Sequence, residues 1–278
     1  MADKNNKNKK KRNWKKTVII VAAVIAVVTP TQLVVLGVFG GIGPMGHLRD
    51  ARLAKLPGNG AAYDFSAIER MEGSPLEGKT LCILGSSVAK GTASQQSAVG
   101  EYLAARFGAT LVKEAVGGTT LTDKGDNSYI KRLVGRLDAN AEYDLFLCQL
   151  STNDATRERP LGEISEGKEL SDFDTSTITG AMEYIICYAQ QTWDCPVVFF
   201  TGSRYDSAEY GAMVERLLEL QEKWGIGVLD LWTDDGFNDI TKDERSLYMN
   251  DGIHPTKAGY RDWWGPEMER QLLEYLRQ

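Results

Sequence analysis

Residues 79–91 read KTLCILGSSVAKG, an apolar run that ends at a glycine and two serines. A short apolar run of this kind is typical of a buried strand. Similar runs follow at residues 109–115, 144–150, 196–202 and 226–232. Stretches with apolar residues at helical spacing lie at residues 95–107, 129–137, 175–192, 207–224 and 256–277, the last interrupted at Gly265 and Pro266. This alternation predicts an α/β fold with a five-stranded parallel sheet that is covered on both faces.

The first 43 residues differ from the rest of the chain. Residues 1–16 carry eight basic side chains and one acidic one, whereas the remainder has 24 basic and 37 acidic ones. Residues 17–43 contain no charge, and their number, 27, exceeds the roughly 20 that span a bilayer as a helix. The basic flank predicts a cytoplasmic tail (1–16), a single transmembrane anchor (17–43) and a body outside the cytoplasm. The alternative is a signal peptide whose cleavage would release the body into the medium.

Residues 44–77 mix glycine, proline and charge, and are expected to be a spacer before a folded domain at 78–278. The part of the chain after residue 16 has a net charge of -13, because it holds 24 basic and 37 acidic side chains. Such a body would repel phosphates, which argues against a nucleic-acid partner.

The histidines and cysteines are few. The chain has two histidines, His47 and His254, and four cysteines without CxxC spacing. Two histidines are too few for a metal site built from several histidines, and the missing CxxC spacing argues against a zinc ribbon. Cys82 and Cys148 fall within expected strands as small buried side chains, while Cys187 and Cys195 are candidates for a disulfide outside the cytoplasm.

Polar residues follow the expected strands, at the edge of the sheet where α/β proteins bind ligands. They are Ser86 and Ser87 after the first strand, Gly117 and Gly118 after the second, Asn153 and Asp154 after the third, and Asp251 and His254 near the C-terminus. Each signal is weak alone, since such residues are common in turns. Together they supply what acyl transfer needs: a hydroxyl nucleophile, a base, a carboxylate to orient the base, and N–H donors for an oxyanion.

The segments GSSV (85–88), VGGTT (116–120), STND (151–154) and DGIHP (251–255) resemble the four blocks of the SGNH hydrolase superfamily, also called GDSL esterases and lipases. The resemblance covers about residues 79–265 and keeps the order of the blocks. Its most specific part is the D-x-x-H-P ending, which is followed by Ala258, Gly259 and Tyr260. The resemblance implies a flavodoxin-like three-layer fold, hydrolysis of esters and no metal cofactor.

The resemblance also implies roles for individual residues. Ser87 would be the nucleophile, His254 the general base and Asp251 the carboxylate that orients it. The backbone N–H groups of Ser87 and Gly118 and the side-chain amide of Asn153 would form the oxyanion hole.

The sequence departs from the family pattern in two places. Ser86 stands where the usual Gly-Asp-Ser block has aspartate. It is therefore a second candidate nucleophile, although the register of the motif favours Ser87. Ser151 replaces the glycine of the usual Gly-x-Asn-Asp block, which puts the local backbone geometry in question. Gly117 is an alternative to Gly118 for the oxyanion contact.

Other residues lie in loops that should approach the site. Lys90, Thr119, Arg204 and Tyr205 are candidates for a substrate pocket, with an exposed loop side chain as the commoner interpretation. Trp263 and Trp264 would either form an aromatic platform for a sugar or anchor the last helix. The polar loop at 155–175 is long enough to act as a lid or to shape specificity.

The sequence therefore predicts a membrane-anchored serine esterase that faces outward and removes short O-acyl groups, acetyl above all, from carbohydrate. A lysophospholipase and an O-acyltransferase are alternatives with the same catalytic groups. An alternative of another class is a non-catalytic module that binds glycans. The departure from the family pattern at Ser86 motivates this alternative.

Overall fold

The structure is a computed structural model that describes residues 32 and 47–277. The predicted cytoplasmic tail, and the predicted transmembrane anchor apart from Gln32, lie outside the described residues. Among the helices of the described ranges, none is long and apolar enough to cross a membrane. The chain divides into two compact units, residues 1–55 and 56–278. The first contributes one described helix, α2 (His47–Leu53).

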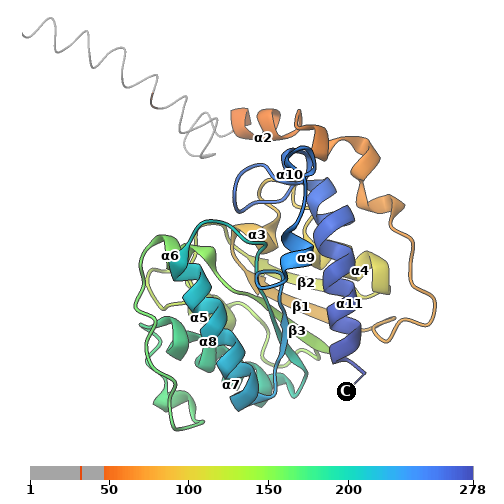
Figure 1. Ribbon diagram of the computed structural model, residues 1–278. Helices are drawn as coiled ribbons and strands as arrows, with labels where there is room; N and C mark the ends of the chain where they lie inside the picture. Colours follow the sequence, from red (N-terminus) through yellow and green to blue (C-terminus); the bar gives the residue numbers. More distant parts are fainter. Residues whose placement is uncertain (1–31, 33–46, 278) are drawn as a thin grey trace, which may run out of the picture. The chain divides into compact units, whose positions relative to one another are not determined.

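The second unit is built on a sheet of five parallel strands in the order β2-β1-β3-β4-β5, which confirms the predicted sheet (Figure 1). The strands are β1 (Thr80–Gly85), β2 (Thr110–Ala115), β3 (Leu145–Gln149), β4 (Val197–Phe200) and β5 (Gly227–Leu229). β1, β3 and β4 are buried along almost their whole length, whereas the edge strand β2 is only partly buried. The serine turn after β1 thus lies near the middle of the sheet.

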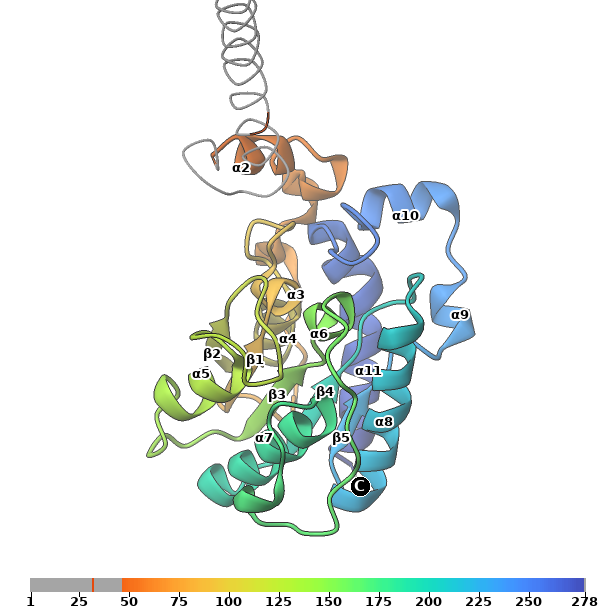
Figure 2. The same ribbon diagram turned by 90° about the vertical axis from the view of Figure 1, so that its left-hand side faces the viewer.

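Helices cover both faces of the sheet, as the apolar strands predict (Figure 2). Phe146 and Cys148 of β3 belong to the core beneath one helical layer, while Leu145 and Leu147 belong to the core beneath the other. The first layer comprises α5 (Tyr129–Gly135), α7 (Ile178–Trp193) and α8 (Ala208–Trp224), and the second α4 (Val99–Phe107) and α11 (Gly265–Tyr275). The alternation of side chains along one strand therefore builds two separate cores.

The last predicted helix changes type where a break is expected. A π-helical stretch, η7 (Gly259–Trp264), runs directly into α11, and Pro266 falls in the first turn of α11, where no N–H is needed. Gly265 is required by close packing, since a Cβ there would lie 2.6 Å from Cε2 of Tyr102. Trp264 is fully buried in the core beside α11, a position that favours the anchoring interpretation over a sugar platform.

Residues 56–77, within the range expected to be a spacer, pack onto the same unit as the sheet. They form three short turns of 3-10 helix, η3 (Pro57–Asn59), η4 (Ala61–Tyr63) and η5 (Phe65–Ala67). The side chain of Asn59 is buried; it donates to the carbonyl of Ala93 at 2.8 Å and accepts from the N–H of Lys257 at 2.9 Å.

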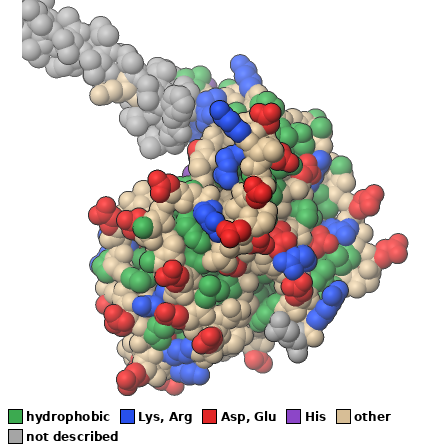
Figure 3. Space-filling model, viewed as in Figure 1, with side chains coloured by type: hydrophobic (Ala, Val, Ile, Leu, Met, Phe, Trp, Pro, Cys, Tyr) green, Lys and Arg blue, Asp and Glu red, His purple; other side chains and the backbone are tan. Residues whose placement is uncertain are grey.

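Short helices that the sequence analysis did not predict begin just after strands or within loops. They are α3 (Ser87–Lys90), α6 (Thr152–Thr156), η6 (Leu170–Asp172), α9 (Asp235–Asn238) and α10 (Lys242–Tyr248). All four cysteines are buried and free, so Cys187 and Cys195 do not form the disulfide considered above. On the face seen in Figure 3, acidic, basic and apolar side chains are interspersed.

Candidate active site

Ser87 is the first residue of α3 and is separated from the end of β1 by Ser86 alone. The turn between strand and helix is tight: a Cβ at Gly85 would lie 2.2 Å from Cβ of Ala89, so only glycine fits there. The helix ends after one turn at Gly91, which adopts the left-handed conformation that glycine tolerates. This geometry holds Ser87 at the carboxyl end of a central strand.

Ser87, His254 and Asp251 form a continuous hydrogen-bonded relay. The Ser87 Oγ atom lies 2.8 Å from Nε2 of His254. On the other side of the ring, Nδ1 of His254 lies 2.9 Å and 3.0 Å from the two carboxylate oxygens of Asp251. The structure thus brings together three residues that are separated by up to 167 positions in the sequence.

The Asp251 carboxylate is itself fixed. Its Oδ1 atom accepts from the backbone N–H groups of Ile253 and His254, each at 2.8 Å. Partial burial acts to raise the pKa of this carboxyl, but its hydrogen bonds with the His254 ring and with the two N–H groups outweigh burial and hold the pKa well below its usual range. An ionised Asp251 keeps the proton of His254 on Nδ1 and leaves Nε2 free to accept the proton of Ser87.

Ser86, the competing serine, faces a different partner. Its side chain is fully buried, and its Oγ atom accepts a hydrogen bond from Nε2 of Gln149 at 3.0 Å. The Oε1 atom of Gln149 accepts from the N–H groups of Ser86 at 2.9 Å and of Ala89 at 2.8 Å. The His254 ring therefore contacts Ser87, whereas Ser86 and Gln149 together fix the turn that carries Ser87.

The loop after β2 passes beside Ser87. A Cβ built at Gly117 would lie 3.8 Å from Cβ of Ser87. Gly118 has a φ of +76°, a left-handed conformation that favours glycine, and its carbonyl accepts from Nη2 of Arg157 at 2.7 Å. Both glycines thus belong to a loop beside Ser87. Gly118 is the oxyanion donor that the motif predicts, and Gly117 is the alternative.

Asn153 and the substituted Ser151 are tied to the same loop. The Asn153 side-chain amide donates to the Thr119 carbonyl at 3.0 Å, which leaves its second N–H available. Ser151 caps α6: its Oγ accepts from the N–H of Asn153 at 3.2 Å and donates to the Thr119 carbonyl at 3.1 Å. Serine in place of the usual glycine thus adds a hydrogen bond between the two loops.

Asp154 was identified in the sequence only as part of an Asn-Asp pair. Its carboxylate is fully buried and accepts from the N–H of Leu121 at 2.7 Å and from the N–H and hydroxyl of Thr122 at 3.1 and 2.9 Å. Burial raises the pKa of Asp154 in spite of these hydrogen bonds. This side chain holds the glycine loop against α6.

Among the predicted pocket residues, Thr119 and Lys90 lie on the elements of the site. The Thr119 hydroxyl donates to the Val116 carbonyl at 2.7 Å and accepts from Arg132 at 3.0 Å, so it braces the loop from within. Lys90 ends α3, which begins with Ser87, and is partly buried.

Arg204 and Tyr205 follow β4. The Arg204 guanidinium donates to Asp235 at 2.7 Å and to the carbonyls of Trp232 and Thr233 at 3.1 and 3.2 Å, which fixes it to the connection after β5. The Tyr205 ring packs against the rings of Tyr210 and Trp232, with each pair of centroids 5.3 Å apart.

The long loop between α6 and α7 is anchored in its middle part by side chains of the helices α7 and α8. Lys223 of α8 donates to the carbonyls of Ser165 and Gly167 at 2.5 and 3.0 Å and to the Glu183 carboxylate at 2.5 Å. Glu183, on α7, is fully buried and also accepts from the N–H of Ser165 at 2.9 Å. The structure therefore places this part of the loop against α7 and α8.

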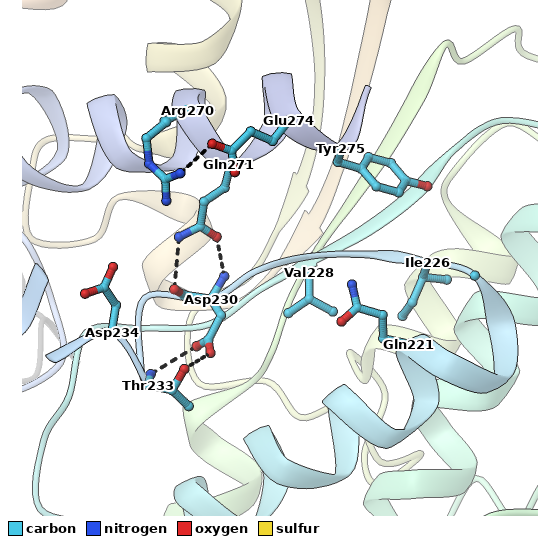
Figure 4. A pocket seen from close by; sticks show the side chains of 11 residues that line it. Gln221, Ile226, Val228, Asp230, Thr233, Asp234, Arg270, Gln271, Glu274 and Tyr275 are labelled. Atoms are coloured by element: carbon cyan, nitrogen blue, oxygen red, sulfur yellow. Dashed lines mark hydrogen bonds and ion pairs between the residues drawn. The ribbon is translucent and has the colours of Figure 1, made fainter. Parts of the chain in front are cut away.

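A separate pocket lies at the edge strand β5, between α8 and α11 (Figure 4). Gln271 spans it and exchanges hydrogen bonds with the backbone of Asp230 at 2.7 and 3.0 Å. Neither Ser87 nor His254 lines this pocket. In the described part of the chain no cluster of three or more His, Cys, Asp or Glu side chains could hold a metal ion.

The model of the GDSL-like Lipase/Acylhydrolase family matches residues 83–261, which is more than half of the chain. The chain belongs to this family. As a GDSL-like acylhydrolase it is a hydrolase of ester bonds, and the matched range contains every residue of the relay and of the loops around it.

Solved structures similar to this GDSL-like hydrolase share its fold at low identity. A Lactobacillus plantarum protein is 21% identical and has a TM-score of 0.55, with 72% of this chain and 97% of that one covered. A Bacteroides ovatus protein named for its likeness to GDSL lipases is 18% identical, with a TM-score of 0.53 and coverage of 72% and 99%. An acetyl xylan esterase is 13% identical, with a TM-score of 0.50 and coverage of 69% and 98%. No curated protein matches the sequence.

Proposed function

We propose that this GDSL-like hydrolase is a serine esterase that cleaves carboxylic esters through an acyl-serine intermediate. The observation that carries the proposal is the relay in which Ser87 Oγ lies 2.8 Å from Nε2 of His254 and Nδ1 lies 2.9 Å from Asp251. A serine hydroxyl becomes an effective nucleophile when a neutral imidazole can take its proton at this distance.

The reaction has two halves. The Ser87 oxygen attacks the ester carbonyl carbon while its proton passes to Nε2 of His254, and the negative charge on the carbonyl oxygen is held by the N–H groups of Ser87 and Gly118 and by the amide of Asn153. Collapse of this intermediate breaks the bond to the alcohol, which leaves with the proton from His254. Water then attacks the acyl-serine with His254 as base, and the acid departs as Ser87 regains its proton. Asp251 stabilises the imidazolium in both halves.

For the substrate we infer short acyl groups, acetyl above all, on carbohydrate. The loop beside Ser87 carries Gly118 without a side chain and binds the polar side chains of Asn153 and Arg157, and this lining suits a small acyl group and a hydroxyl-rich alcohol better than a long chain. The fold likeness to an acetyl xylan esterase supports the same substrate class.

For the location we propose that residues 17–43 anchor the protein in a membrane, with residues 1–16 in the cytoplasm and the hydrolase unit outside. The support is the charge asymmetry of the sequence around an uncharged run of 27 residues. Full-length protein that stays in the membrane fraction after alkaline extraction is the expected result. Recovery of a shortened body in the medium would contradict the anchor and indicate cleavage.

The catalytic proposal is tested by reacting the full chain, in mild detergent, with a fluorophosphonate probe. We expect labelling at Ser87 that is lost in His254→Ala, because the probe reports an activated serine. Folded wild-type protein that takes no label would refute the esterase and favour a module that binds glycans.

The substrate is tested on the same preparation. Acetylated xylo-oligosaccharides and 4-nitrophenyl acetate should be hydrolysed faster than 4-nitrophenyl palmitate and lysophosphatidylcholine. Preference for lysophosphatidylcholine would indicate a lysophospholipase, and transfer of acetyl to an added sugar in place of acetate release would indicate an acyltransferase.

A further inference from the structure

Arg132 is the one charged side chain of α5 that is fully buried, and it lies within the protein beneath the loops of the site. An arginine in such a position must satisfy five N–H donors. Its Nε donates to the Asn127 carbonyl at 3.0 Å, and its Nη1 to the Glu114 carbonyl and carboxylate at 2.9 and 3.3 Å. Its Nη2 donates to the Gly85 carbonyl at 2.9 Å and to the Thr119 hydroxyl at 3.0 Å. Every donor of the guanidinium is thus used.

The partners of Arg132 are the segments that carry the site. Gly85 ends β1, two residues before Ser87, and Glu114 is the last residue but one of β2. Thr119 directly follows Gly118 in the glycine loop. One rigid, planar group therefore connects the nucleophile turn to the loop that should supply an oxyanion donor.

Thr119 extends this connection to Asn153. Its hydroxyl accepts from Arg132 and donates to the Val116 carbonyl, and its own carbonyl accepts from the side chain of Asn153 at 3.0 Å. The positions of Gly118 and Asn153 relative to Ser87 therefore depend on a chain of hydrogen bonds that starts at one guanidinium.

We propose that Arg132 is a positioning residue that, through Gly85 and Thr119, sets the distance between the nucleophile and the oxyanion donors. This inference rests on the proposed esterase. A donor that is misplaced by about 1 Å loses much of its effect on the transition state while ground-state binding changes little. Loss of Arg132 should therefore lower kcat and leave KM nearly unchanged.

The test uses the full-length protein with 4-nitrophenyl acetate as substrate and a phenylboronic acid as a tetrahedral mimic of the intermediate. Arg132→Lys keeps the charge but cannot reach all five acceptors, and we expect its kcat to fall about a hundredfold and its affinity for the boronic acid to fall in parallel. KM should change by less than about threefold, since substrate binding does not need the oxyanion donors to be aligned.

Arg136→Lys is the matched control. Arg136 follows α5 and also contacts the Glu114 carboxylate, at 3.4 Å, but it is exposed and contacts neither Gly85 nor Thr119. We expect this variant to keep wild-type kcat and boronic acid affinity.

Thr119→Val removes only the hydroxyl that links Arg132 to the loop, so it tests the inference even where Arg132→Lys fails to fold. The variant loses the hydrogen bond from Arg132 and the one to the Val116 carbonyl, and kcat should fall at least about tenfold with little change in KM. Folded variants with wild-type kcat and boronic acid affinity would overturn the positioning role while wild-type turnover still supports the esterase. A wild-type protein without turnover would instead refute the proposed function itself.

Discussion

Gln149 binds Ser86 with both atoms of its side-chain amide: Oε1 accepts from the Ser86 N–H at 2.9 Å, and Nε2 donates to the Ser86 Oγ at 3.0 Å. Gln149 is itself buried at the end of β3. The pair fixes the residue before the nucleophile from the neighbouring strand. It also gives a physical reason for the serine that stands where the family usually has aspartate, because a hydroxyl can accept the amide proton without bringing a charge into the core.

The two serines of the turn should respond very differently to alanine. Ser87→Ala removes the group beside His254, and turnover of 4-nitrophenyl acetate should fall on the order of a million-fold, as it does for other serine nucleophiles. Ser86→Ala removes one buried hydrogen bond and should lower turnover by about tenfold at most. Steady-state kinetics on both variants decides the assignment, and a Ser86→Ala enzyme as inactive as Ser87→Ala would contradict it.

Asn153→Ala should lower kcat by roughly a hundred- to thousandfold, because it removes a donor to the oxyanion. Ser151→Ala is the matched comparison, since Ser151 and Asn153 donate to the same carbonyl of Thr119 but only Asn153 has a second N–H to offer. Its loss should be about tenfold or less. Equal losses in the two variants would mean that Asn153 only supports the loop.

Asp251→Asn should reduce kcat by about ten-thousandfold, because an amide cannot hold the tautomer that leaves Nε2 free. The measurement is kcat near neutral pH, where the lowered pKa of Asp251 keeps the wild-type carboxylate ionised. A variant with more than about a tenth of wild-type kcat would show that the carboxylate is dispensable.

Acid should destabilise the wild type partly through the same group. A carboxyl whose pKa is lower when folded than when unfolded contributes stability above its unfolded pKa of about 3.9, and this contribution is lost as the pH falls through the folded value. The melting temperature of the wild type should therefore fall more steeply below about pH 4 than that of Asp251→Asn. Parallel curves from pH 6 to pH 2.5 would contradict the lowered pKa.

The ion pair of Lys223 and Glu183 should be important for stability. Glu183 is fully buried, so Lys223→Met would leave its carboxylate without a counter-charge and should cost about 3–5 kcal/mol in the free energy of unfolding. Adding Glu183→Gln should recover a large part of this loss. Chemical denaturation of the single and double variants measures the difference, and a double variant no more stable than the single one would show that the carbonyls of the loop, not Glu183, need the lysine.

The fold was largely predictable because the strands β1, β3, β4 and β5 are short and mostly apolar. The helices α5, α7 and α8 begin within about three residues of their predicted starts, since each has a clear apolar stripe. The predicted helix at 95–107 begins later, at Val99, because residues 95 and 96 adopt positive φ angles of 56° and 69° that a helix does not allow. The edge strand β2 is only partly buried, which agrees with the charged residues Lys113 and Glu114 in its sequence.

The polar supports of the site could not be predicted in the same way. Arg132 lies between Ile130 and Leu133 in the sequence but not on their apolar stripe, so the helical spacing gives no sign of its burial, and nothing in the local sequence identifies Gly85, 47 residues earlier, as its partner. Gln149 resembles any other residue of a buried strand until its contact with Ser86, 63 residues away, is known. Motif spacing predicts which groups react, whereas the residues that support them become visible only in the folded chain.

The contacts of the Asn59 side chain limit how far the chain can be shortened from its N-terminal side. Its buried side chain joins the Ala93 carbonyl, in the segment after Ser87, to the N–H of Lys257, three residues after His254. A shortened protein that begins at residue 78, just before the matched family region, would leave both backbone groups without this partner and open the interior near Ser87 and His254. The smallest version that keeps these contacts therefore begins near Leu56, where the compact unit starts.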